Sequence, residues 1–140
     1  MSRADFQTYT QTIPELFDDF LTNLDVSPVT GNVAVVTNED AVKLRMYNIV
    51  MTNLLERPYN PDFGSKVNSI LFEPFGDIAK NSLDTTIRAA IKNNEPAATI
   101  ARLDIIPSIS EDAYRIDLYF TMINIPDQTF YVPIILKRAR

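Results

Sequence analysis

The stretch AYRIDLYFTM, residues 113–122, decides the fold, because hydrophobic and polar side chains alternate along it. A period of two residues is typical of a β-strand with one buried face. The predicted buried face carries Tyr114, Ile116, Leu118, Phe120 and Met122. The opposite face carries Arg115, Asp117, Tyr119 and Thr121. We therefore expect a strand that lies against a hydrophobic core on one side.

The segments on both sides of this stretch repeat the alternation. In the segment TIARLDIIP before it, residues 99–107, we expect the core-facing side chains to be Ala101, Leu103 and Ile105. In the segment FYVPIILK after it, residues 130–137, we expect them to be Phe130, Val132, Ile134 and Leu136. Three such segments with short polar connections predict an antiparallel meander. Pro133 has no N–H to donate, so we expect the last strand at an edge of the sheet.

Two long segments before the meander have the periodicity of helices. The second, GDIAKNSLDTTIRAAIKNNE, carries one hydrophobic stripe, pairs Asp84 with Arg88 one turn later, and ends before Pro96. The first, residues 38–55, has hydrophobic residues over more than the roughly 100° that a surface helix buries. That helix either lies between two layers or touches another chain.

Together these patterns predict an α+β fold, in which a small antiparallel sheet has two long helices packed on one face. The sheet would consist of the C-terminal three-strand meander and an N-terminal strand at residues 33–36. A length of 140 residues suits a single domain, residues 1–140. For residues 1–30 two readings stay open, because residues 13–24 fit either a helix or an extended N-terminal arm.

A rigid corner, ERPYNPDFGS at residues 56–65, connects the two predicted helical regions. Each of its two prolines fixes one backbone angle, and Gly64 allows a positive φ angle. We expect Tyr59 and Phe63 to bury their rings and to hold the corner on the core. A stiff loop of this kind presents a fixed shape to a partner.

The composition excludes several classes of function. The chain has no histidine and no cysteine, so imidazole and thiol chemistry are absent, and we predict no cofactor and no metal site. A net charge of −5 argues against binding of nucleic acid. No hydrophobic run approaches the roughly 20 residues that span a bilayer, and the start lacks a secretory signal, so we expect synthesis in the cytoplasm and no membrane contact. The basic end LKRAR is either a solvated tail or a binding handle.

Catalysis would have to use carboxylates alone. Glycoside hydrolysis needs two acids placed roughly 5–9.5 Å apart on either side of a bond. Candidates near the corner are Glu56, Asp62 and Glu73, and further acids are Glu15, Asp18 and Asp19. A carboxylate beside a turn more commonly caps backbone amides or pairs with a basic side chain. We therefore predict no enzyme, and keep a lysozyme-like peptidoglycan hydrolase as the alternative.

The order of these motifs resembles the GPW/gp25 family of small baseplate wedge proteins in contractile phage tails and related injection machines. The resemblance covers roughly residues 17–138. Its pieces are SPVTGNVAVV, TNLLERPYNPDFGSKV, ILFEPFGD, AIKNNEP and then the strand meander. The ERPYNPDFGS string and the LFEP that follows it are the specific parts.

One position departs from the family pattern. The family carries Glu-Pro-Arg after the second helix, and this motif is thought to lock it to paired wedge subunits. Here the triplet is Glu95, Pro96 and Ala97, so the guanidinium is missing at its usual place. Arg57 and Arg88 are the candidates that we name for its replacement.

The resemblance implies a structural part of the tail baseplate, assembled in the host cytoplasm and carried in the virion. Implied partners are other wedge subunits, the tail sheath protein, and the tail tube or hub proteins, and strand addition to an open sheet edge would template the first sheath ring. The same parts fit the equivalent component of a type VI secretion system. The expected partner-binding residues are Arg57, Tyr59, Phe63, Gly64, Glu95, Pro96, Phe130, Val132 and Ile134.

Overall fold

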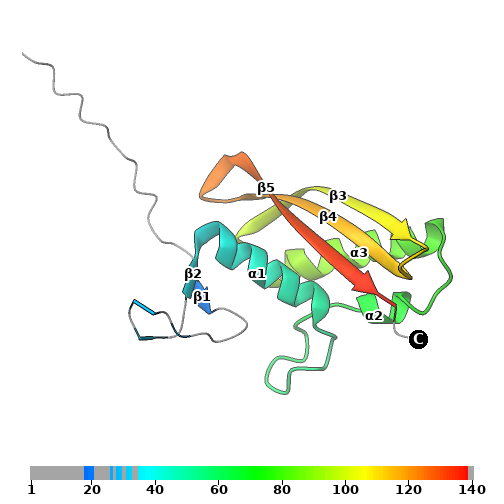
Figure 1. Ribbon diagram of the computed structural model, residues 1–140, viewed down its shortest axis with the longest axis horizontal. Helices are drawn as coiled ribbons and strands as arrows, with labels where there is room; N and C mark the ends of the chain where they lie inside the picture. Colours follow the sequence, from blue (N-terminus) through cyan, green and yellow to red (C-terminus); the bar gives the residue numbers. More distant parts are fainter. Residues whose placement is uncertain (1–17, 21–25, 27, 30, 33–34, 139–140) are drawn as a thin grey trace, which may run out of the picture.

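A three-stranded antiparallel sheet with two helices on one face forms the body of the protein (Figure 1). The computed structural model describes residues 18–20, 26, 28–29, 31–32 and 35–138. The elements follow in the order β1 (Asp18–Phe20), β2 (Val35–Thr37), α1 (Asn38–Met51), α2 (Val67–Ile70), α3 (Asp77–Asn94), β3 (Ala98–Ser108), β4 (Ala113–Met122) and β5 (Ile125–Lys137). The predicted α+β class is confirmed.

The sheet has the order β3-β4-β5, so β4 is central and both β3 and β5 are edge strands in the described part of the chain. In the register, Leu118 of β4 lies opposite Leu103 of β3 and Val132 of β5. Helix α1 packs against β5, and α3 packs against β3. The predicted meander, and the edge position of the strand that contains Pro133, are thus confirmed.

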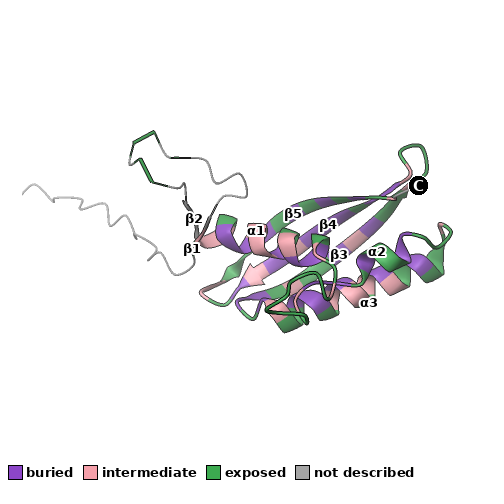
Figure 2. Cartoon of the chain, turned by 90° about the horizontal axis from the view of Figure 1, so that it is seen from below, coloured by how far each residue is buried: buried purple, intermediate pink, exposed green. Residues whose placement is uncertain are grey.

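The hydrophobic core lies between the sheet and the two helices. All five alternating residues of β4 predicted to face inward are buried, and so is the stripe Leu83, Ile87, Ala90 and Ile91 of α3. Figure 2 shows the buried residues along the sides of the helices and strands that face one another. Burial raises the pKa of the Tyr114 phenol above its usual value, so this core residue stays neutral.

Strand β3 contains a bulge that sequence alternation did not predict. Ile100 pairs with Phe120 and Arg102 with Tyr119, which leaves Ala101 without an opposite residue. The extra residue shifts the alternation by one position, so Ile100 packs against the core. Ala101 is exposed, and its predicted place on the core face is wrong.

The N-terminal strand pairs differently from the prediction. Strand β2 pairs with β1 in a separate two-stranded sheet, with Asp18 opposite Thr37. Of the ambiguous segment 13–24, only Asp18–Phe20 lie among the described residues, and these are extended. The rest of the proposed arm over residues 1–30, namely residues 1–17, 21–25, 27 and 30, lies outside the described residues.

Helix α1 is shorter than the predicted 38–55 and exposes part of its wide hydrophobic face. It ends at Met51, where the chain turns into the corner. Its buried residues are Ala41, Val42, Met46, Ile49 and Val50. Tyr47 and Met51 are exposed, so the helix does not lie between two layers of described residues. The chain also has no helix, among the described residues, that is long and apolar enough to cross a membrane.

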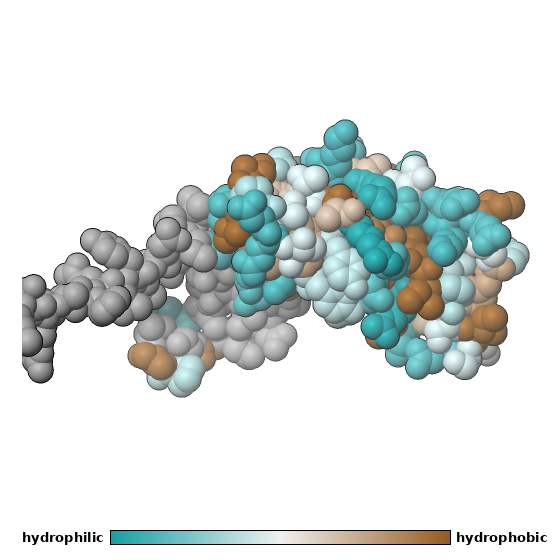
Figure 3. All heavy atoms as spheres, turned by 90° about the horizontal axis from the view of Figure 1, so that it is seen from above, coloured by the Kyte–Doolittle hydropathy of each residue, from teal (hydrophilic) through white to brown (hydrophobic). Residues whose placement is uncertain are grey.

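The outer face of the sheet carries a polar cluster. Tyr131 donates a hydrogen bond of 2.8 Å to Asp117, which also accepts one of 3.2 Å from Arg115. The Tyr119 and Tyr131 rings lie 5.2 Å apart. Hydrogen bonds to Tyr131 and Asp117 raise the pKa of Arg115. On the side of the molecule in Figure 3, hydrophobic residues form small groups among hydrophilic ones.

The basic C-terminal segment is partly fixed in the structure. The Arg138 Nε donates a hydrogen bond of 2.7 Å to the Leu71 carbonyl, and Nη1 lies 3.3 Å from Asp112 Oδ1. The guanidinium also lies over the Phe75 ring, 4.9 Å from its centroid. Arg138 therefore joins the end of β5 to two loops, and the reading of a wholly solvated tail is wrong for this residue.

Candidate interaction site

The corner between α1 and α2 is a loop closed by hydrogen bonds, and it projects away from the sheet (Figure 1). The Ser65 N–H donates to the Thr52 carbonyl at 2.9 Å, and the Ser65 hydroxyl donates to the Val50 carbonyl at 2.8 Å. Across the loop, the Leu55 N–H donates to the Pro61 carbonyl at 2.9 Å. These bonds satisfy backbone groups at the end of α1 and give the loop a fixed shape.

Gly64 is needed at the base of the corner for two reasons. Its φ angle is +115°, a conformation that side chains rarely adopt. A Cβ atom there would lie 2.4 Å from the Thr52 carbonyl oxygen, closer than non-bonded atoms approach. The prediction that Gly64 supplies a positive angle is confirmed.

The two aromatic residues of the corner have different environments. Phe63 is half-buried and packs against the core, as predicted. Tyr59 is fully exposed, at 102% of its reference area, so its prediction as a buried anchor is wrong. The turn in which the Asn60 N–H donates to the Arg57 carbonyl holds Tyr59 at the far end of the loop, beyond reach of the core.

Arg57 stacks on Phe63. The central carbon of its guanidinium lies 3.9 Å from the centroid of the Phe63 ring. This is within the range of a favourable cation–π contact. The guanidinium is thereby held over a ring that itself packs against the core.

Glu95 is a buried carboxylate held from two sides. The residue is 4% exposed, and its Oε1 accepts a hydrogen bond of 3.3 Å from the Ala97 N–H. Its Oε2 lies 3.9 Å from Nη1 of Arg45, a charge contact too long for a hydrogen bond. The same Arg45 donates to the Asp18 carbonyl at 2.7 Å and to Asp19 Oδ2 at 3.4 Å.

Sequence reasoning missed Arg45. Its contact with Glu95 joins residues 50 positions apart, which no local pattern reports. The available signal was a basic residue inside the mostly hydrophobic segment 44–51. Both candidates named for the missing arginine line a cavity together with Glu95, but Arg88 already forms an ion pair with Asp84 at 2.9 Å.

A pocket of 290 Å³ brings three predicted site residues together. Arg57 and Phe63 come from the corner, and Glu95 comes from the end of α3. The remaining lining residues are Asp19, Arg45, Asn48, Ile49 and Asn94. The corner and the Glu95-Pro96 turn are therefore one surface, although more than 30 residues separate them in sequence.

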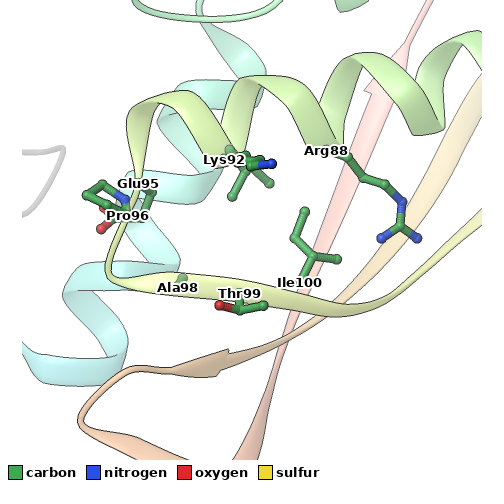
Figure 4. A pocket seen from close by; sticks show the side chains of 8 residues that line it. Arg88, Lys92, Glu95, Pro96, Ala98, Thr99 and Ile100 are labelled. Carbon is green, nitrogen blue, oxygen red and sulfur yellow. The ribbon is translucent and has the colours of Figure 1, made fainter.

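A second, larger cavity of 530 Å³ opens on the other side of Glu95 (Figure 4). It lies between α3 and the start of β3, next to Pro96. Arg88 extends from α3 toward β3, and Ile100 extends from β3 toward α3 (Figure 4). This cavity, called the β3 groove below, has an apolar floor and two basic side chains, Arg88 and Lys92.

Three predicted contact residues lie elsewhere. Phe130, Val132 and Ile134 are buried on the core face of β5, so their side chains are not available to a partner. The alternation had placed them correctly on one face, but that face is the one that the helices cover. Only the main chain of β5 remains at the sheet edge.

Of the acids proposed for catalysis, Glu56, Asp62 and Glu73 line no common pocket, and Glu15 lies outside the described residues. Glu56 and Glu73 are exposed, and Glu56 Oε2 accepts a hydrogen bond of 2.8 Å from the Asn53 N–H. Asp62 lines a pocket of 290 Å³ that contains no second acid. Within the described residues, no group of three or more acidic side chains is placed to hold a metal ion.

Comparison with known proteins finds a relative that aligns with most of the chain. The chain is 26% identical over 119 residues to the baseplate wedge protein gp25 of Enterobacteria phage T4, an alignment that covers 85% of this chain and 83% of gp25. The chain is similar to gp25. The resemblance read from the corner and the LFEP segment is thus confirmed, although no family model matches the chain.

Solved structures share the fold of this gp25-like protein. A crystal structure described as a tail lysozyme from Geobacter sulfurreducens matches with a TM-score of 0.64 and 18% identity, over 76% of this chain and 99% of that one. A protein of the anti-feeding prophage baseplate matches at 0.61 and 19%, over 88% and 86%. A protein of the contracted pyocin R2 baseplate matches at 0.53 and 17%, over 71% and 95%.

Proposed function

We propose that this chain is a structural wedge component of a contractile tail baseplate, which joins wedge subunits around the tube and templates the first sheath ring by β-strand addition. Its similarity to gp25 and its fold, shared with two baseplate proteins, support a baseplate role. The observation that carries the finer proposal is the open edge of β3 with a groove beside it.

The two sheet edges are unequal. Strand β5 has Pro133 near its middle, and the missing N–H weakens pairing along that edge. The proline of β3, Pro107, is the residue before its last, so Ala98–Ile106 keep their N–H groups. The outer edge of β3 has no paired strand among the described residues. We therefore propose β3 as the receiving edge.

The β3 groove suits the side chains of an added strand. Side chains of a strand alternate between the two faces, so every second one would enter the space between β3 and α3. Ile91 and Ile100 line this space, and Lys92 lies at its side. An arriving segment with alternating hydrophobic residues and an acidic residue would fit these surfaces.

Proline at position 101 tests the receiving edge. Ala101 has no opposite residue on β4 and is exposed, so an Ala101→Pro substitution takes no residue out of the β3–β4 pairing register. We expect tails with this substitution to contain the chain in their baseplates and to lack sheath in negative-stain electron micrographs. Ala101→Ser is the matched control and should give normal sheath.

Normal sheath on Ala101→Pro particles would contradict the choice of β3, provided that the variant is present and folded. Deletion of β5 is not a usable test, because Phe130, Val132, Ile134 and Leu136 would leave the core. Sheath loss that instead follows changes at the β5 edge would move the proposal to that strand.

We propose that the role is non-enzymatic, assembled in a host cytoplasm and carried in the tail. The described acids lie outside the β3 groove, apart from Glu95, which is buried and bound to Arg45. We expect purified protein to leave peptidoglycan turbidity unchanged over hours. Clearing that is lost in Glu73→Gln, with the fold intact, would instead support the hydrolase alternative.

The same architecture would serve a type VI secretion system or another injection machine. The anti-feeding prophage and pyocin matches are consistent with either setting. Genes beside this one decide between them: sheath, tube and tape-measure genes indicate a tail, whereas an ATPase and membrane-complex genes indicate secretion.

A further inference from the structure

We propose that Arg57, held over the Phe63 ring, binds the carboxylate of an Asp or Glu side chain from a neighbouring subunit. The site is the pocket that Arg57 and Phe63 form with Glu95. This inference rests on the proposed function, since the carboxylate belongs to a protein that the chain meets in the baseplate. It adds the chemistry of the contact and the residue that makes it.

Arg57 is already placed for such a contact. Its guanidinium lies 3.9 Å from the Phe63 centroid, and Phe63 is packed on the core. Hydrogen bonds across the loop, such as the one from the Leu55 N–H to the Pro61 carbonyl, fix the backbone that carries both residues. A side chain ordered before binding loses less conformational entropy when the complex forms.

Arg57 also differs from the other arginines that the structure describes, because it has no carboxylate within ion-pair distance there. The described arginine–carboxylate pairs are Arg45 with Asp19 and Glu95, Arg88 with Asp84, Arg102 with Asp104, Arg115 with Asp117, and Arg138 with Asp112. The contact with the Phe63 ring uses none of the guanidinium N–H groups as donors to an oxygen, and a guanidinium carries five such donors. Those donors match the two oxygens of a carboxylate.

The neighbouring acids do not satisfy Arg57 and do not close the pocket. Glu95 is buried and held by the Ala97 N–H and by Arg45. Asp19 is also bound to Arg45. The pocket volume of 290 Å³ exceeds the volume of a carboxylate side chain, so an Asp or Glu can enter beside Arg57. Of the four charged residues that line the pocket, Arg45 pairs with both acids, Asp19 and Glu95, so Arg57 is the charge left for a partner, and it would attract an acid and repel a lysine or arginine.

Zero-length crosslinking of assembled particles tests this inference directly. The variant Arg57→Lys places an amine where the guanidinium lies, and a water-soluble carbodiimide joins amines to carboxylates in contact. We expect mass spectrometry of treated, purified tails to find position 57 joined to an Asp or Glu of another protein. Lys43, 3.3 Å from Asp40, provides the internal control for the reagent.

Arg115→Lys is the matched control variant. Arg115 is exposed on the central strand β4 and pairs with Asp117 of its own strand at 3.2 Å, so its substitution should give only a link within the chain. The inference is overturned if position 57 yields no link to another protein while the Lys43–Asp40 link forms. Links from position 57 to Glu56 or Asp62 alone overturn it equally.

Charge reversal provides a second measurement that does not depend on the reagent. Because like charges in contact cost several kcal/mol, we expect Arg57→Glu to lower the incorporation of the chain into tails at least about tenfold. Arg57 is exposed, so the urea midpoint of the isolated variant should fall only slightly, through loss of the contact with Phe63. Unchanged incorporation overturns the inference, whereas absence of the parent chain from tails overturns the proposed function itself.

Discussion

Substitution of Gly64 by alanine is expected to lower the free energy of unfolding by about 3 kcal/mol. Two costs add up at this position. Alanine is strained at a φ of +115°, and its Cβ would lie 2.4 Å from the Thr52 carbonyl oxygen. That oxygen accepts the Ser65 N–H, so the backbone cannot move aside without breaking the bond that closes the corner.

Urea unfolding followed by circular dichroism measures this change, with Gly76→Ala as the control. Gly76 has an extended φ of 179°, and a Cβ atom there has open space within 4 Å. We expect the control to be as stable as the parent. A loss below about 1 kcal/mol for Gly64→Ala would mean that the corner relaxes at little cost, and that it is less rigid than its hydrogen bonds indicate.

Two neighbouring isoleucines on β5 give the second large effect. Ile134 is 0% exposed on the core face, whereas Ile135 is 53% exposed on the outer face. We expect Ile134→Ala to lower the free energy of unfolding by about 3 kcal/mol, because it removes buried methyl groups and leaves a cavity. Ile135→Ala should change stability by less than about 0.5 kcal/mol.

The same pair of variants distinguishes a core role from a partner-binding role for the β5 side chains. Thermal and urea unfolding of the isolated protein report the core role, and incorporation into tails reports partner binding. Equal stabilities for the two variants would contradict the assignment of Ile134 to the core. Reduced incorporation of a stable Ile135→Ala protein would instead assign a contact to the outer sheet face.

Local periodicity predicted most of the fold. The period of two in β4 and the stripe on α3 each depend on residues within one element, and both faces were assigned correctly. The alternation failed at Ala101, because a bulge inserts one residue and reverses the faces of every residue before it. The helix end at Met51 also escaped prediction, since it depends on hydrogen bonds with the corner, including that from Ser65 to Val50.

The candidate site was only partly predictable from sequence. Unusual composition identified the corner and the Glu95-Pro96 turn, but periodicity could not show that they share a pocket. Whether the Tyr59 side chain is exposed depends on one turn of the loop. The ion-pair partner of Glu95 is Arg45, which lies on a different helix. Phe130, Val132 and Ile134 are buried because the helices cover their face of the sheet. The alternation along a strand does not show which of its two faces the helices will cover.

Pro133 lies near the middle of β5, whereas the proline of β3, Pro107, lies beside its last residue, and this difference has a further consequence for the free protein. A sheet with two equivalent open margins lets identical molecules stack side by side without limit, as in amyloid growth. Here one margin is interrupted, so head-to-tail stacking of copies is disfavoured while one docking direction is kept. The unassembled protein should therefore stay monodisperse in solution. Any row of copies that does form should grow in one direction only.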